Sequence, residues 1–270
     1  MSVVLVTGCS SGFGEAIARG FARRGDTVCA TMRRPQLASK ELAQQPGIEI
    51  SALDVTDRDS RIRAIEAVLS RHSRIDVLVN NAGVAVFGSI EDVPENVARL
   101  VFETNYFAAV ELMRLVLPGM RKQGAGRIVN ISAVGAILAT PLLGVYAATK
   151  HALDAATAAV DIEARPFGVR AISILPGQFR TAIGEKSPGR FIADEYRGIA
   201  ASMDRWRAAN AADVLEDLGP VVEATIQAAH APRPRARYVV GIGLADRVRQ
   251  AARELDELHE FESARAGVVD

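Results

Sequence analysis

The sequence predicts an α/β fold in which a parallel, doubly wound sheet is covered by helices on both faces, giving three α/β/α layers. Short β-branched runs alternate with helix-like segments along the whole chain of 270 residues. The apolar runs are continuous rather than alternating, as strands that are covered on both faces require. A glycine-rich turn joins the first run to the first helical segment, where such folds bind nucleotides. No linker or repeat interrupts this order, so we expect a single domain over residues 1–270.

The individual elements follow from β-branched runs and from helical periodicity. Strands are predicted at residues 3–6, 27–31, 48–53, 77–79, 127–131, 169–175 and 237–240. Helical patterns lie between them, at residues 15–24, 58–71, 97–120 and 146–166. Parallel strands are joined by crossovers that contain a helix, so this alternation of strands and helices favours one parallel sheet.

Residues 181–212 break the rhythm, with Pro188, three glycines and Trp206 in a stretch that lacks a clear period. The stretch follows a predicted strand, at the end of the sheet where ligands bind in such folds. We interpret it as a mobile substrate lid; an ordinary connection is the alternative. Residues 245–264 are charged and helix-like, which is typical of a solvated helix or of a helix at a subunit contact.

Composition excludes several classes of protein. The 32 basic and 32 acidic residues cancel, so nothing indicates a nucleic-acid partner. Only two cysteines are present, which fits a reduced, cytoplasmic compartment. The apolar start has no basic segment before it, and no run of apolar residues is long enough for a membrane span. The four histidines show no metal-ligand spacing, so no metal site is expected.

The glycine-rich turn has the spacing T-G-x-x-x-G-x-G. Its glycines allow a tight turn, a close approach of the backbone to a pyrophosphate and close packing of the helix. The following helix N-terminus offers free N–H groups and partial positive charge. Glu15 follows the last glycine, where a P-loop needs lysine. A glycine turn without a ligand is the alternative; the residues expected to contact a cofactor are Gly8, Ser10, Ser11, Gly12, Phe13 and Gly14.

The second predicted strand ends in Arg33 and Arg34, with no carboxylate to accept from the ribose of NAD. A guanidinium suits a 2′-phosphate, so NADP(H) is favoured, with NAD(H) also allowed. Two solvated surface arginines are the alternative. Asp54 and Val55 follow the third strand and are expected at the adenine, although Asp54 also competes with Asp57 to cap the next helix.

Tyr146 and Lys150 lie four residues apart, on one face of a predicted helix. The lysine cation, together with an oxidised nicotinamide, is expected to lower the pKa of the phenol, making Tyr146 the catalytic acid/base. Ser132 ends the strand before this helix and is expected to donate to the substrate oxygen. Asn105 interrupts a helix and is expected to hold a water beside Lys150 as a proton relay.

Further residues are expected at the site from their places after strands. The nicotinamide half of the cofactor is expected to meet Asn81, Ala82, Gly83, Pro176, Gly177, Phe179 and Thr181, together with Tyr146 and Lys150. The small-molecule substrate is expected to meet Val84, Val134, Leu138, Leu143 and Gln178, which are mostly apolar.

From Val3 to about Val240 the chain resembles the short-chain dehydrogenase/reductase family, through the motifs just described and through Pro176-Gly177. The resemblance implies a Rossmann-type, seven-stranded sheet and a catalytic tetrad of Asn105, Ser132, Tyr146 and Lys150. It also implies hydride transfer between a secondary alcohol and a ketone, or between an alcohol and an aldehyde, and a homodimer or homotetramer. The sequence around residues 7–11, 30–33 and 166–168 is similar to that of the steroid and retinol dehydrogenase branch, which implies a fairly apolar substrate.

Two departures and two alternatives accompany the resemblance. Phe13 stands where the family usually has Ile or Leu, and Ser11 stands where some NADP-selecting members have a basic residue, which leaves Arg33 and Arg34 to select the phosphate. A nucleotide-binding sensor without turnover would have no need for both Tyr146 and Lys150. An NAD-dependent epimerase or dehydratase also uses this pair, but the two arginines and the short C-terminal part weigh against it.

Overall fold

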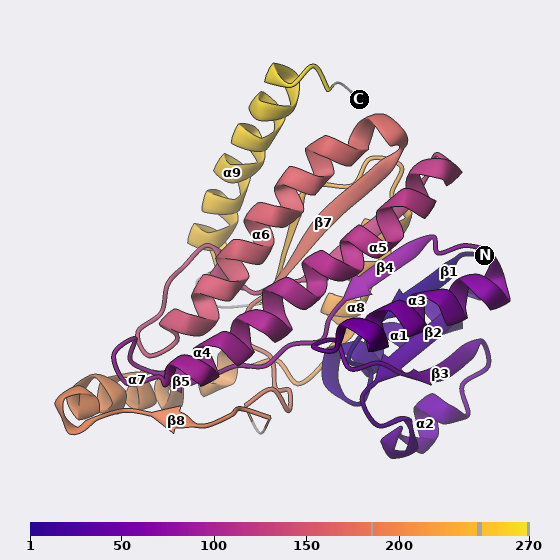
Figure 1. The fold of residues 1–270 in the computed structure, drawn as a ribbon. Helices are drawn as coiled ribbons and strands as arrows, with labels where there is room; N and C mark the ends of the chain where they lie inside the picture. Colours follow the sequence, from indigo (N-terminus) through magenta and orange to yellow (C-terminus); the bar gives the residue numbers. More distant parts are fainter. Residues whose placement is uncertain (185, 242–244, 269–270) are drawn as a thin grey trace.

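The predicted strands form one parallel sheet in the computed structural model, which describes residues 1–184, 186–241 and 245–268 (Figure 1). The sheet has seven strands in the order β3-β2-β1-β4-β6-β7-β9, and every neighbouring pair is parallel. The α/β, three-layer prediction is therefore confirmed, and the strand bounds are β1 Val3–Val6, β2 Thr27–Met32, β3 Ile48–Ala52, β4 Val77–Asn80, β6 Gly126–Ile131, β7 Val169–Pro176 and β9 Arg237–Val240.

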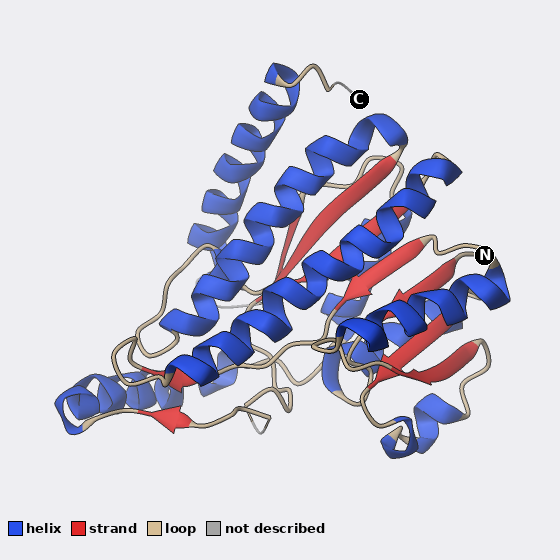
Figure 2. Cartoon of the chain, viewed as in Figure 1, coloured by secondary structure: helices blue, strands red, loops and turns tan. Residues whose placement is uncertain are grey.

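Helices cover both faces of the sheet (Figure 2). Val4 and Val6 of β1 pack with α1 (Gly12–Arg23) and α8 (Gly219–His230) in one core. Their neighbours Val3 and Leu5 point the other way and join a second core. This second core is formed with α3 (Arg58–His72), α5 (Ala108–Gln123) and the end of α6 (Gly144–Ala164). The apolar runs are continuous because the strands are buried on both faces, as expected from the sequence.

The strand order reverses beside β1. From β1 the chain proceeds outward to β2 and β3, then returns to β4 on the other side of β1 and continues outward to β9. The connections that follow β1 and β4 consequently leave the sheet in opposite directions. Such a reversal opens a crevice at the carboxyl ends of the two strands, which is where open α/β sheets bind ligands.

The helix predicted over residues 97–120 is divided. It consists of α4 (Glu95–Phe102), a π-helical turn (Glu103–Phe107) and α5. The wide turn places Asn105 inside the molecule, where only 1% of its surface is exposed. π-helical turns are rare and are found mostly at functional sites.

The segment 181–212 contains more regular structure than a lid loop. Its strand β8 (Arg190–Phe191) pairs in parallel with β5 (Phe87–Gly88), and its helix α7 spans Arg197–Ala209. Figure 1 shows α7 and β8 together beside β5 and the start of α4. The segment is fastened there, because the Ala193 amide donates to Asp92 Oδ2 at 2.8 Å and the Tyr196 hydroxyl donates to Glu91 Oε2 at 2.6 Å.

The charged C-terminal stretch forms α9 (Ala245–Arg265), which docks on its own chain. His259 Nε2 lies 3.0 Å from Asp161 Oδ2 in α6, and Asp256 accepts from Arg237 at 2.9 Å. The short helix α2 (Lys40–Ala43) completes the set of described α-helices. None of the helices in the described ranges has both the length and the apolar character needed to cross a membrane.

Candidate active site

A cavity of about 480 Å³ opens at the carboxyl ends of the strands, where the crevice was expected. Its volume lies in the range of small-molecule and cofactor sites. Of the residues predicted for the cofactor, only Gly14 and Arg34 are absent from its wall, which includes Gly8, Ser10, Ser11, Gly12, Phe13, Arg33, Asp54, Val55, Asn81, Ala82, Gly83, Tyr146, Lys150, Pro176, Gly177, Phe179 and Thr181.

Two glycines of the glycine loop have different surroundings, one open toward the cavity and one packed against the protein. Gly12 has φ +62°, which disfavours other residues, and an added Cβ would find only Thr181 nearby, at 3.7 Å. Gly14 is different, since its added Cβ would overlap the carbonyl of Gly8 and the side-chain amide of Asn81. Gly14 therefore packs the loop against the end of β4, whereas Gly12 keeps the wall of the cavity open for a ligand backbone or phosphate.

Thr7 and Asn81 fasten this loop to the neighbouring strand end. The Thr7 hydroxyl accepts from the backbone amides of Asn81 at 2.9 Å and Ala82 at 3.0 Å. In return, Asn81 Nδ2 donates to the carbonyl of Thr7 at 2.8 Å. Thr7 is buried, so these bonds hold the loops after β1 and β4 together at the crevice. The spacing of the glycine loop does not by itself indicate this role of Thr7.

The adenosine end of the predicted site has one arginine at the cavity. Arg33 is exposed and lines the wall, whereas Arg34 is exposed and lies outside it. Asp54 lines the wall as well, and its Oδ1 accepts from the amide of Thr56 at 3.0 Å and from the Thr56 hydroxyl at 2.7 Å. Asp57, and not Asp54, caps α3 by accepting from Asp59 and Ser60. The alternative of Asp54 as the helix cap is thereby removed.

Tyr146 and Lys150 lie on the same face of α6 and both reach the cavity wall. Lys150 is almost wholly buried, and its Nζ lies 5.8 Å from the centre of the Tyr146 ring. The same Nζ donates to the carbonyl of Ile131, at the end of β6, over 2.9 Å. One of three ammonium protons is thus fixed by the sheet, and the cation is oriented by it.

Burial controls the pKa values of this pair in the free chain. It raises the pKa of the Tyr146 phenol to about 12 and lowers the pKa of Lys150 to about 8. Both shifts favour the neutral form, as desolvation does. The expected lowering of the Tyr146 pKa is therefore not found without a cofactor: the loss of solvent outweighs the neighbouring ammonium. The half-buried phenol is protonated at neutral pH.

Ser132 and Asn105 flank the pair in different ways. Ser132 directly follows β6 and lines the cavity. Its hydroxyl donates to the carbonyl of Lys150 at 3.4 Å. Asn105 does not line the cavity; its Oδ1 accepts from the Val84 amide at 2.9 Å, and its Nδ2 donates to Thr149 Oγ1 at 3.0 Å. A Cβ on Gly83 would lie 3.2 Å from Asn105 Oδ1 and 3.8 Å from Lys150 Nζ. A side chain at position 83 would therefore crowd Asn105 Oδ1.

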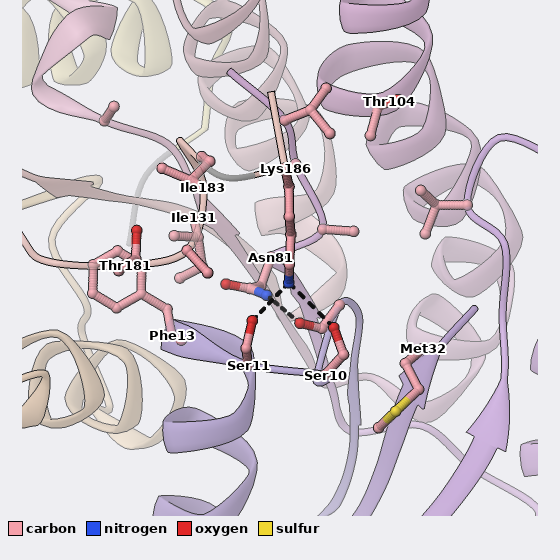
Figure 3. Close-up of a pocket in the computed structure, with 18 of the residues that line it drawn as sticks. Ser10, Ser11, Phe13, Met32, Asn81, Thr104, Ile131, Thr181, Ile183 and Lys186 are labelled. Atoms are coloured by element: carbon pink, nitrogen blue, oxygen red, sulfur yellow. Dashed lines mark hydrogen bonds between the residues drawn. The ribbon is translucent and has the colours of Figure 1, made fainter. Parts of the chain in front are cut away.

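Of the five residues predicted for the substrate, Val84 lines the cavity and Val134, Leu138, Leu143 and Gln178 lie outside it. The wall instead draws on α4, the π-helical turn and the 181–212 segment. Wall residues that the sequence analysis missed include Met32, Thr56, Leu100, Thr104, Ala133, Ile183, Lys186 and Pro188. Leu100 and Thr104 share a helix face, and no local pattern distinguishes them from solvated positions. Figure 3 shows Lys186 reaching down to Ser10 and Ser11, with Ile183 on one side of it and Thr104 on the other.

One cluster in the described part of the chain has ligand atoms that a metal could share, although none was expected. Atoms of Cys29, Glu49 and His72 all lie within 4.8 Å of one another. Arg71 Nε is paired with Glu49 Oε2 at 3.2 Å, so a guanidinium already neutralises the carboxylate. None of these residues lines the cavity.

Comparison with known proteins agrees with this geometry. The family model described as short chain dehydrogenase matches residues 2–189. The chain is 35% identical to NADPH-dependent 3-dehydrocapnine reductase of Ornithobacterium rhinotracheale, covering 89% of this chain and 88% of that one. It is 33% identical to human 17-beta-hydroxysteroid dehydrogenase type 1, covering 88% and 76%. A short-chain dehydrogenase structure from Streptomyces avermitilis matches with TM-score 0.80 and 34% identity, over 98% of each chain. The chain therefore belongs to the short-chain dehydrogenase/reductase family of oxidoreductases.

Proposed function

We propose that this protein is an NADP(H)-dependent carbonyl reductase or alcohol dehydrogenase that acts on a fairly apolar ketone or secondary alcohol. The observation that carries the proposal is the meeting of Tyr146, Lys150 and Ser132 on the wall of the cavity that the glycine loop also lines. A protein that only bound the nucleotide would have no need for a phenol, an ammonium and a hydroxyl at the far end of that cavity.

The proposed cofactor fits the residues that are present. Gly12 opens the wall where phosphates would approach, and Arg33 supplies a guanidinium at the end of β2, where NAD-selecting folds need a carboxylate. When bound, the nicotinamide supplies or accepts the hydride. The NADPH dependence in the name of the 3-dehydrocapnine reductase relative supports the same choice.

The protein groups then have separate tasks. Tyr146, protonated at neutral pH, is placed to give its proton to the carbonyl oxygen, as a general acid does. Lys150, held by the Ile131 carbonyl, stabilises the phenolate that this transfer leaves. Ser132 is the proposed donor that polarises the same oxygen. The space between Asn105 and Lys150 is the proposed place for a water that returns the proton.

An apolar substrate is supported by the apolar residues of the cavity wall. Val84, Leu100, Ala133, Ile183 and Pro188 line it. We propose that the 181–212 segment acts as the substrate lid, because it contributes Ile183 and Pro188 to this wall. The steroid dehydrogenase among the relatives supports a large substrate.

A panel of ketones and aldehydes of increasing apolar size, incubated with NADPH or NADH, tests the proposal. Turnover is followed as the loss of absorbance from the reduced nicotinamide. In Tyr146→Phe we expect kcat to fall by about 10²–10⁴-fold, the range for general acids, with NADPH binding retained. Tyr238→Phe is the matched control, since Tyr238 lies in β9 outside the cavity wall. Full turnover by Tyr146→Phe would refute the assignment.

The proposed assembly is a homodimer or homotetramer. Leu100 and Phe107 support it, because 46% and 49% of their surfaces are exposed, about two turns apart on one helical segment. Apolar side chains that cluster at a surface are typical of association sites. Sedimentation velocity measures the mass directly, and a monomer at every concentration would contradict this part of the proposal.

A further inference from the structure

A thiol, a carboxylate and an imidazole meet at the edge of the sheet, away from the cavity wall. Cys29 of β2 and Glu49 of the edge strand β3 are paired in register, so their side chains project from the same face of the sheet. His72 is the last residue of α3, which packs on that face, with Cys29 and Val68 in one core. Ligand atoms of the three residues lie within 4.8 Å of one another. Because they come from three elements, no spacing in the sequence marks them.

The three groups meet without forming ordinary hydrogen bonds. His72 Nε2 lies 3.1 Å from Glu49 Oε1, and Arg71 Nε lies 3.2 Å from Glu49 Oε2. Both His72 Nε2 and Glu49 Oε2 are buried atoms, yet within the described chain neither has a partner in hydrogen-bond geometry. Buried polar atoms of folded proteins nearly always have a partner, and a bound ion is one that would satisfy a nitrogen and an oxygen together.

The ligand types at this site fit zinc. Zn²⁺ binds thiolate sulfur, imidazole nitrogen and carboxylate oxygen in tetrahedral sites, and three protein ligands leave one position for water. With bonds of about 2.0–2.3 Å, its ligand atoms are about 3.3–3.8 Å apart, so the widest gap in the cluster needs to close by about 1 Å at most. Rotation of Glu49 and His72 can supply this, since 37% and 19% of their side chains are exposed. Mg²⁺ and Ca²⁺ prefer oxygen ligands alone.

We propose that Cys29, Glu49 and His72 bind a zinc ion that ties the edge strand β3 to the end of α3. Burial raises the pKa of the Cys29 thiol to about 11, so the thiol carries its proton in the metal-free chain. Coordination forms the Zn–S bond and releases this proton to solvent, while the imidazole and the carboxylate each donate a lone pair. None of the three residues lines the cavity, so the inference does not depend on the proposed reaction.

Arg71 is the group that opposes the metal. Its guanidinium pairs with Glu49 Oε2, which leaves Oε1, the oxygen beside His72, for the ion. The Arg71 side chain is 47% exposed, so it can turn into solvent when a divalent cation binds. Removal of its charge should therefore tighten zinc binding, whereas it would weaken the cluster if the arginine were the intended partner of the carboxylate.

Titrations of the full chain with Co²⁺ and Zn²⁺, after removal of metal with a chelator, test the site. A thiolate bound to Co²⁺ gives a sulfur-to-cobalt charge-transfer absorption, and its displacement by Zn²⁺ gives the zinc affinity. We expect the absorption in the wild type and its loss in Cys29→Ser. His72→Gln and Glu49→Gln should each weaken zinc binding by at least about a hundred-fold, more than the loss of an outer-shell partner. Arg71→Gln should tighten it by about two- to five-fold, the effect of one exposed ion pair.

His230→Gln is the matched control. His230 Nε2 also lies beside a carboxylate, 3.4 Å from Asp26 Oδ2, but it belongs to no three-ligand group of the described residues. Its zinc affinity should equal that of the wild type. With zinc 100-fold above its Kd, the Tm of the wild type should rise by about 5–10 °C.

A wild type without the charge-transfer absorption would overturn the inference. Equal zinc affinity in the wild type and His72→Gln would overturn it as well, and this comparison holds even if Cys29→Ser, altered in the core, does not fold. Weaker zinc binding in Arg71→Gln would show that the arginine supports the cluster, and would overturn the competition assigned to it.

Discussion

The pKa values of Tyr146 and Lys150 predict which group limits carbonyl reduction at alkaline pH. With the pKa of Tyr146 raised to about 12 by burial, the phenol keeps its proton throughout the range in which the protein is assayed. With the pKa of Lys150 lowered to about 8, also by burial, the ammonium loses its proton within that range. Proton transfer from Tyr146 then leaves a buried phenolate without a neighbouring cation, which is costly. Reduction should therefore slow above pH 8 because of the lysine.

The magnitude follows from the titration of one group. A lysine with a pKa of about 8 is about nine-tenths charged at pH 7 and about one-tenth charged at pH 9. The ammonium lies 5.8 Å from the phenol ring, close enough to contribute directly to the charge that develops there. If only the charged form supports transfer, kcat/KM for the carbonyl substrate falls about ten-fold between these two values.

The assay is a pH profile of kcat/KM at saturating NADPH, with the affinity for NADPH measured at each pH. Lys150→Arg separates the two candidate groups, because arginine keeps its charge over the whole range. The variant is expected to be slower but to lose the alkaline decline. Lys122→Arg is the matched control and should keep it. A decline that persists in Lys150→Arg would show that Tyr146 itself titrates, and would refute the assignment to lysine.

Two further predictions concern the cofactor and the fold. Arg33→Ser should reduce the preference for NADPH over NADH by about ten- to a hundred-fold, the loss of a charged phosphate contact, whereas Arg34→Ser, outside the wall, should not; equal kcat/KM ratios in the two variants would contradict this. Asp161→Asn should lower the free energy of unfolding by about 3–5 kcal/mol in urea titrations, because Arg165 and Arg170 both lose the buried carboxylate that they share. Burial raises the pKa of Asp161, but bonds from His259, Arg170 and Arg165 outweigh it and hold the pKa well below its usual range. Its contribution is then present above the unfolded pKa and is lost as pH falls below it, so the wild type should lose stability on acidification more steeply than the variant.

Local patterns were sufficient to predict the sheet and the glycine loop. A buried parallel strand is marked by its own β-branched residues, and the loop is marked by glycines at fixed spacing, so neither requires knowledge of distant residues. All seven strands of the main sheet were predicted, with ends displaced by a residue at most, whereas the short strands β5 and β8 were not. Tyr146, Lys150 and Ser132 were predicted to meet because each is tied to the end of a strand or the start of a helix, and the carboxyl ends of parallel strands share one edge.

What the sequence did not predict depends on contacts between distant segments. Lys186 lies 175 positions from Ser11, and strand β8 pairs with β5 from the other half of the chain. The π-helical turn has no local signal beyond the poor helix propensity of Asn105, since its cause is the pair of bonds to Val84. The pKa of Tyr146 was expected to fall because a charge is visible in a sequence, whereas burial, which raises it, is not.

Helix α6, which carries the proposed catalytic residues, is held by different kinds of contact from the 181–212 segment, which is the proposed lid. Near its start, Thr149 accepts from Asn105 and donates to the carbonyl of Tyr146; near its end, Asp161 binds the Ala171 amide of β7 at 2.9 Å. The bonds from Asn105 and from Ala171 are buried, so the helix that carries Tyr146 is fixed at both of its ends. The 181–212 segment is fastened by the two-residue pairing of β8 with β5, by the part-buried Ala193–Asp92 bond and by exposed pairs such as Tyr196–Glu91, which are individually weak. Hydride transfer needs a fixed geometry, which the buried bonds of α6 provide. Substrate entry needs motion, which the weaker contacts of the 181–212 segment allow.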